Sequence, residues 1–128
     1  MKFRNSKQKL TNDELLVFEK QFNLNLPNSY KEVMLEYNGG YPDKKYFRGG
    51  GVYFLPIKYG DWNLEKCIQV TSDIFPKNYL PFIDYGDGSI CLSLDAETFD
   101  QIYFINESGD IELVCNSFEE FMNELSDN

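Results

Sequence analysis

Histidine is absent from the sequence. Because imidazole is the side chain that changes protonation near neutral pH, its absence excludes the Ser-His-Asp triad, the Cys-His dyad and the HExxH zinc helix. An enzyme built on this chain would depend on carboxylates, a lysine or a tyrosine, and no spacing of these residues singles out a pair. The sequence therefore predicts a non-enzymatic protein, with a carboxylate-based enzyme left as an alternative.

Cysteine is scarce as well. The three cysteines lie far apart, without a CxxC pair, at Cys67, Cys91 and Cys115. An odd number of cysteines at such spacing does not support a disulfide framework or a zinc site. We expect three buried, reduced thiols, and neither a metal nor another cofactor.

Long apolar runs are also missing. No stretch approaches the ~20 apolar residues that a membrane-spanning helix needs, and residues 1–10 lack the apolar segment of a signal peptide. These observations predict a cytoplasmic protein without a membrane partner. With 128 residues, the chain is long enough to bury a core, and we expect one domain over 1–128 with a flexible basic N-terminus at 1–9.

Basic side chains are confined to the first part of the chain. Residues 1–77 hold all 12 Lys and Arg together with 9 Asp and Glu, whereas residues 78–128 hold 12 acidic residues and no basic one. An acidic half of this kind is repelled by nucleic acid and attracted to a basic protein surface. A surface kept acidic for solubility is the alternative, although the depletion of positive charge exceeds what solubility requires.

The helix predicted over 26–38 has the clearest boundaries. Pro27 suits a first helical turn because its φ is preset, and Gly39 or Gly40 is predicted to end the helix in the left-handed conformation. Four apolar residues recur at i, i+3, i+4 and i+7 and predict a buried stripe: Tyr30, Val33, Met34 and Tyr37.

Two more helices are predicted from capping boxes, in which Ser or Thr is followed three residues later by Glu. Thr11 and Glu14 start the first, and Ser117 and Glu120 start the last. The segment 61–71 has both helical spacing and strand propensity, and we favour a helix.

The remaining segments predict strands and loops. Strands are expected over 52–55, 82–84, 89–94, 101–105 and 111–115, the last four forming an antiparallel meander with turns at 85–88, 95–100 and 106–110. A mobile glycine-rich loop is expected over 41–51, and an irregular crossing over 75–81 because Pro76 and Pro81 push their predecessors out of the helical region. The predicted fold is α+β: a mostly antiparallel sheet with helices packed on one side, an N-terminal helix pair and a C-terminal helix.

Five short motifs occur in order along the chain: Phe18-Glu19, Leu26-Pro27 with Tyr30, Asn38-Gly39-Gly40, Leu80-Pro81-Phe82 with Asp84, and Ser117-Phe118 with Phe121. As an ordered set, from about Leu10 to Leu125, they resemble the SUKH superfamily, which includes the yeast cell-wall assembly regulators. The resemblance implies an α+β fold and a bacterial immunity protein, which neutralises a secreted or contact-dependent toxin, often a nuclease, by binding it. The yeast members imply an alternative, a regulatory scaffold for host proteins. In the turn after the Leu-Pro-Phe segment, members often carry two glycines followed by Asn or Asp, whereas this chain reads Gly86-Asp87-Gly88.

The acidic turns are the predicted partner-binding site. Their residues flank the strand predicted over 89–94: Asp84, Tyr85, Asp87, Asp95, Glu97 and Asp100. Carboxylates gathered at the ends of the meander would suit Arg and Lys of a toxin with a basic surface, and would not suit nucleic acid. Trp62 is added as an interface anchor, with a core position as the alternative.

Overall fold

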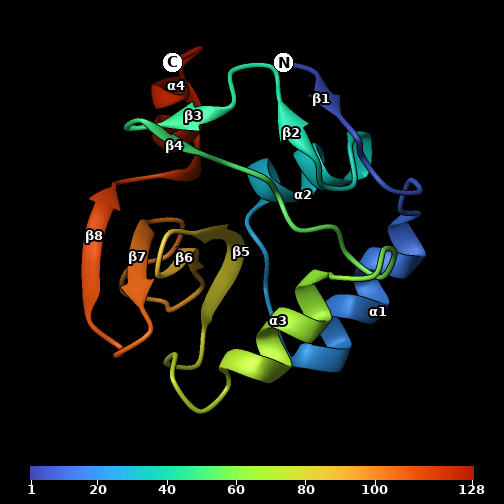
Figure 1. Cartoon of the computed structure of the whole chain (residues 1–128). Coiled ribbons are helices and arrows are strands. Elements are labelled where there is room, and N and C mark those ends of the chain that lie inside the picture. Colours follow the sequence, from blue (N-terminus) through green and yellow to red (C-terminus); the bar gives the residue numbers. More distant parts are fainter.

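The computed structural model covers residues 1–128 and confirms the α+β fold, with four helices, a four-stranded antiparallel sheet and two small two-stranded sheets (Figure 1). The helices are α1 (Asn12–Phe22), α2 (Asn28–Glu36), α3 (Leu64–Thr71) and α4 (Phe118–Glu124). The main sheet consists of β5 (Tyr79–Tyr85), β6 (Gly88–Ser93), β7 (Ile102–Asn106) and β8 (Ile111–Cys115), and the short strands are β1 (Phe3–Arg4), β2 (Tyr41–Pro42), β3 (Tyr46–Phe47) and β4 (Gly50–Gly51).

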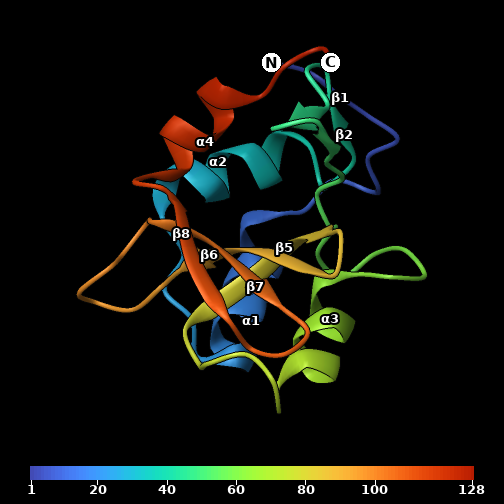
Figure 2. The same ribbon diagram turned by 60° about the vertical axis from the view of Figure 1, so that its left-hand side comes forward.

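The four sheet strands are neighbours in sequence order, which confirms the predicted meander. Ile90 and Leu92 of β6 pair with Phe104 and Ile102 of β7, so these four side chains share one face of the sheet. Figure 2 shows α2 and α4 together above the strands and α1 behind them, while α3 packs along β5. Cys91, on the opposite face of β6, is buried like Cys67 and Cys115, and all three thiols are unpaired.

The core is an aromatic cluster that joins these layers. Tyr30 of α2 packs edge-on against Phe82 of β5 and Phe118 of α4, with ring centroids 5.8 and 5.7 Å apart. Phe54 also contacts Phe82, at 5.4 Å, and all four rings are fully buried. The buried stripe predicted for the helix over 26–38 is therefore confirmed at Tyr30, the residue on which three elements meet.

The predicted capping boxes are confirmed in full for α1 and in half for α4. Thr11 Oγ1 accepts from the amide of Glu14 at 3.1 Å, and the Glu14 carboxylate accepts from the amide of Thr11 at 2.9 Å. At α4, Ser117 Oγ accepts from the amide of Glu120 at 3.0 Å, but the Glu120 carboxylate accepts from the amide of Asn116 instead. The helix favoured over 61–71 is present as α3, capped by the side chain of Asn63.

Three predictions were wrong in detail. Segment 52–55 is largely buried but pairs through isolated bridges, with Phe54 opposite Gly40 and Ile83, so it is not a strand. Within 41–51, backbone pairing forms β2, β3 and β4, where a loop was expected. Leu80 and Pro81 lie inside β5, because the extended backbone that proline imposes on its predecessor is also that of a strand, and the proline is accommodated beside a bulge at Pro81 to Ile83.

The two glycines after α2 also have a different role from the one predicted. The helix stops at Glu36, and Tyr37 is already extended with φ −135°, so Gly39 (φ 75°) and Gly40 (φ 108°) follow the stop. A Cβ atom on Gly39 would lie 2.7 Å from the carbonyl oxygen of Phe54, and one on Gly40 would collide with the carbonyl oxygen of Arg4. Glycine is required here because three backbone segments approach one another closely.

The segment 1–9 takes part in this approach. Phe3 is buried and stacks on Tyr37 with ring centroids 5.4 Å apart, while β1 pairs with β2. The amide of Lys7 donates to the carbonyl of Asn38 at 3.0 Å. Part of the segment for which the sequence predicts a flexible basic N-terminus therefore packs against the fold.

The buried side chain of Asn38 connects these segments. Its amide nitrogen donates to the carbonyls of Gln8 at 3.0 Å and Ile57 at 2.8 Å, and its oxygen accepts from the amide of Ile57 at 2.8 Å. Three backbone groups are thus satisfied by one fully buried side chain.

Replacing Asn38 by Ala should destabilise the protein strongly, because the amide and carbonyl of Ile57 would remain buried without partners and the carbonyl of Gln8 would lose its donor. We expect a loss of roughly 2–4 kcal/mol in the free energy of unfolding, measured by urea denaturation. The matched control is Asn123→Ala, which removes an exposed amide from α4 and should change the free energy little. Equal effects of the two substitutions would contradict the role assigned to Asn38.

Candidate interaction surface

Asp84 and Trp62 come together at the surface where β5 passes the start of α3. The indole Nε1 of Trp62 donates to Asp84 Oδ2 at 2.9 Å, and the Cys67 thiol lies 3.9 Å from Oδ1. Trp62 is 41% exposed, so it does not occupy a position in the core. The pair presents an aromatic ring and a carboxylate side by side.

Asp87 joins Asp84 near the Gly88 end of β6. The carbonyl of Asp87 accepts from the amide of Glu107 at 2.9 Å, which draws the turn between β7 and β8 against the turn between β5 and β6. Within the second turn, the Asn106 side chain accepts from the amides of Ser108 and Asp110. The structure thus gathers four exposed carboxylates in two adjoining turns and at the end of β5 beside them, named here the turn cluster: Asp84, Asp87, Glu107 and Asp110.

Tyr85 makes contacts within the fold and is not free to bind a partner. Its hydroxyl donates to the carbonyl of Phe47 at 2.6 Å, and its ring packs on those of Phe47 and Phe104. A side chain on Gly50 would overlap the same ring. Tyr85 therefore fastens the β3–β4 hairpin to the sheet, and its ring is half-buried.

The other predicted carboxylates lie apart from the turn cluster. Asp95, Glu97 and Asp100 lie in the loop from β6 to β7, at the Ser93 end of β6, which is about 17 Å from its Gly88 end for a strand of this length. Asp100 is half-buried, and burial, helped by the nearby Glu119, raises the pKa of its carboxyl although the amide of Phe118 opposes the shift. The seven predicted residues therefore do not form one surface.

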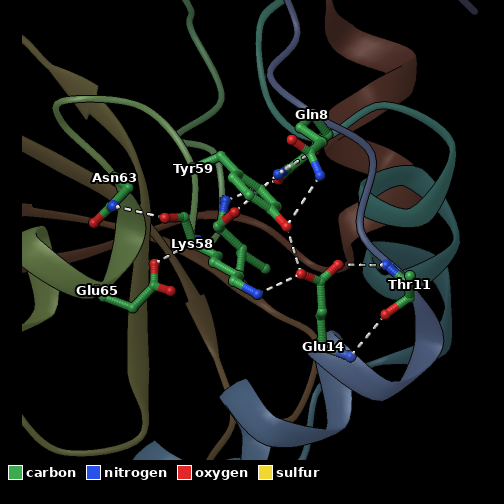
Figure 3. Close-up of polar contacts among 9 residues, drawn as sticks. Gln8, Thr11, Glu14, Lys58, Tyr59, Asn63 and Glu65 are labelled. Atoms are coloured by element: carbon green, nitrogen blue, oxygen red, sulfur yellow. Dashed lines mark hydrogen bonds and ion pairs between the residues drawn. The ribbon is translucent and has the colours of Figure 1, made fainter.

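A polar network that the sequence did not predict links the N-terminal segment, α1 and the segment before α3 (Figure 3). Glu14 Oε2 accepts from Lys58 Nζ and from the hydroxyl of Tyr59, each at 2.5 Å, and Gln8 Nε2 donates to the Tyr59 oxygen at 3.2 Å. The amide of Lys58 donates to the carboxylate of Glu65 in α3 at 2.9 Å. The capping box identified Glu14, but no local pattern shows that a residue 44 positions away is its partner.

The ionisation of Glu14 depends on this network. Its hydrogen bonds from Lys58, Tyr59 and Thr11 lower the pKa of the carboxyl from 4.5 to about 2, while the same contact with Glu14 raises the pKa of Lys58. All the groups are at or near the surface, so the network joins elements of the fold and does not form an enclosed reaction site.

A second charged cluster lies where β8 meets α4. Arg48 Nε is 3.2 Å from Glu124 Oε2, and Arg48 Nη2 donates to the carbonyl of Val114 at 2.9 Å. Ligand atoms of Cys115, Glu120 and Glu124 lie within 4.8 Å of one another. Burial raises the pKa of the Cys115 thiol to about 12, so the thiolate that metals bind is disfavoured, and the guanidinium of Arg48 already neutralises a carboxylate.

The Glu14 network predicts a specific dependence of stability on pH. Because the folded state lowers the pKa of this carboxyl, its ionised form stabilises the fold above about pH 4.5, and this stability is lost as the pH falls towards 2. Glu14→Gln keeps a capping side chain but cannot titrate, so its urea midpoint should fall less steeply between pH 5 and pH 2 than that of the wild type.

The control for this experiment is Glu32→Gln, which removes an exposed carboxylate from α2. Its midpoint should follow the wild-type pH profile. A Glu14→Gln profile as steep as the wild type would show that the contacts with Lys58 and Tyr59 do not persist in solution.

Comparison with known proteins identifies the family. None of the helices combines the length and apolar character needed to cross a bilayer. The SMI1/KNR4 family (SUKH-1) matches residues 9–124, and its proteins are commonly immunity proteins and generally non-catalytic. A protein of Bacillus subtilis (strain 168), the SPbeta prophage-derived uncharacterized protein YokK, is 27% identical over 146 aligned positions that cover 91% of this chain and 75% of that protein. Because the family match takes in nearly the whole chain, this protein belongs to the SMI1/KNR4 (SUKH-1) family, as the five motifs predict.

Proposed function

We propose that this chain is an immunity protein of the cytoplasm, which binds a toxin with a basic surface, most simply a nuclease, and blocks it. The observation that carries the proposal is the turn cluster. It places four exposed carboxylates in and beside two adjoining turns of a half of the chain that lacks any basic residue. The partner class is supported by the family, whose proteins typically bind cognate toxins.

Inhibition would follow from occupation of the toxin's substrate site. A nuclease holds its substrate by Lys and Arg side chains that contact phosphates. Carboxylates standing where phosphates would bind can accept the same hydrogen bonds, and Arg in particular offers a paired geometry for a carboxylate. The blocked toxin would remain folded but unable to admit nucleic acid.

Trp62 supplies the apolar part of such a contact. Its indole is exposed beside the turn cluster and is already held by Asp84, so little side-chain freedom would be lost on binding. Trp is among the residues that contribute most to binding at protein interfaces. We therefore place the centre of the proposed interface at Trp62 and Asp84.

Charge reversal at the turn cluster should weaken toxin binding. We expect Asp87→Lys combined with Glu107→Lys to lower the association rate and the affinity about tenfold or more, because like charges then face each other. The effect should shrink as salt is raised, since screening weakens long-range attraction. The measurements are protection of toxin-expressing cells by the coexpressed chain, and binding kinetics with the toxin encoded beside it.

Two matched variants make this experiment specific. Asp95→Lys with Glu97→Lys, the loop variant, reverses the same charge at the other end of β6, and Glu32→Lys with Glu36→Lys does so on α2. If the loop variant alone abolishes protection, the interface belongs at residues 95–100 and the turn cluster is the wrong site. If the wild type gives no protection and captures several host proteins instead, the immunity proposal fails in favour of a regulatory scaffold.

A further inference from the structure

One edge of the main sheet is covered by another segment, and the other edge is open. Beyond β5, the segment 52–55 covers the edge: the amide of Leu55 donates to the carbonyl of Phe82 at 3.0 Å, and Phe54 forms a bridge with Ile83. Beyond β8 there is no strand, and β7 is its one neighbour in the sheet. Arg48 reaches the carbonyl of Val114, at the far end of β8, and leaves residues 111–113 uncovered.

The uncovered part of β8 lacks the usual protection of an edge strand. Natural edges are commonly blocked by lysine, proline or a bulge, because an open row of backbone groups can pair with another chain. Here the sequence is Ile111-Glu112-Leu113, all exposed, with Ile111 45% and Leu113 48% accessible. The irregularity in pairing adjoins this stretch, because it falls between the pairs Tyr103–Leu113 and Ile102–Cys115, while Ile111, Glu112 and Leu113 are paired in regular register.

The two apolar side chains stand on one face of the sheet. Leu113 is paired with Tyr103 and Ile111 with Ile105, so both lie beside residues that already form an apolar surface, in which Tyr103 packs on Tyr79 at 5.3 Å. Glu112 is paired with Phe104 and points to the other face. An added strand would therefore meet alternating apolar and acidic positions.

We propose that residues 111–113 of β8 accept an extended segment of a basic partner protein, which adds a fifth strand to the sheet. The segment would place apolar side chains beside Ile111 and Leu113 and a Lys or Arg beside Glu112, while backbone hydrogen bonds supply the common part of the affinity. The charge of the partner rests on the proposed function. Glu107 and Asp110, two members of the turn cluster, lie in the turn that leads into β8, so the acidic surface continues to this edge.

A second copy of this chain is a poorer occupant of the edge. Two β8 strands related by a two-fold axis at Glu112 would bring that carboxylate against its own equivalent, between molecules that each carry a net charge of −9. Arg48 lies near this edge but is already paired with Glu124 at 3.2 Å. Charge complementarity therefore selects a basic segment.

The test uses the whole isotope-labelled chain and two synthetic octapeptides, one alternating Val with Lys and the other alternating Val with Glu. At millimolar concentration and low salt, the Lys peptide should shift the NMR amide signals of residues 111–113 and slow their hydrogen exchange several-fold. The Glu peptide should do neither, because its charges face Glu112 and the rest of the acidic half.

The matched variants are Ile111→Lys with Leu113→Lys, the edge variant, which blocks the edge as natural proteins do, and Leu16→Lys with Val17→Lys, which places the same charge on exposed positions of α1. The first should weaken binding of the Lys peptide about tenfold and the second should leave it unchanged. Shifts that fall outside β8, equal binding by the edge variant, or self-association of the free chain through β8 would overturn the inference.

The same variants separate this inference from the proposed function. If the wild type protects cells from the toxin and the edge variant protects them equally well, the immunity proposal stands and the strand addition is wrong. If the Lys peptide binds at β8 while the wild type gives no protection, the open edge is real and its partner is not a toxin.

Discussion

The hydrogen bonds of Asn38 are the constraint from which the arrangement of the N-terminal half follows. One buried amide holds the backbone at Gln8 and Ile57 and so fixes the start of α1 and the approach to α3 relative to the end of α2. The adjoining Gly39 and Gly40 then permit contacts with Phe54 and Arg4 that any side chain would prevent. Because Phe54 bridges to Ile83, this junction also covers the β5 edge of the sheet.

The main sheet has one covered edge, at β5, and one open edge, at β8, so its two sides differ in what they expose. The β5 side carries the aromatic core, in which Phe54, Phe82 and Tyr30 meet. The β8 side carries the exposed side chains of Ile111 and Leu113, with the carboxylate of Glu112 between them. The two proposals would have a partner extend from Trp62 and Asp84 at β5, across the adjoining turns, to the open edge at β8, so the contact would spare the buried rings.

Much of the fold could be predicted because its signals are local. The capping pair of Thr11 and Glu14, the apolar stripe that includes Tyr30, and the alternation of the second half each depend on residues a few positions apart. The errors arose where distant segments decide the conformation. Segment 52–55 has strand propensity, but Gly40 and Ile83 pair with it at single positions, so no ladder forms.

The candidate surface was predicted less well for the same reason. Composition identified the acidic half, but it could not distinguish a free carboxylate such as Asp87 from Asp100, which folds back towards α4, or foresee that Tyr85 is tied to Phe47. Whether two turns adjoin depends on the register of β6 with β7, where Gly88 pairs with Asn106. Register is set by the packing of the whole sheet, which no short motif encodes.

The segregation of charge along the chain also affects how the protein turns as it diffuses towards a charged partner. Exposed lysines and arginines gather around β1 and β2, with Lys2, Arg4, Lys44 and Lys45 in or beside these strands, whereas the tip of the β7–β8 turn, far from them in Figure 1, carries Glu107 and Asp110. This separation of charge gives the molecule an electric dipole, and the field of a cationic protein exerts a torque on it. It would rotate during diffusion until the β7–β8 turn leads, so a larger share of collisions would begin in a productive orientation.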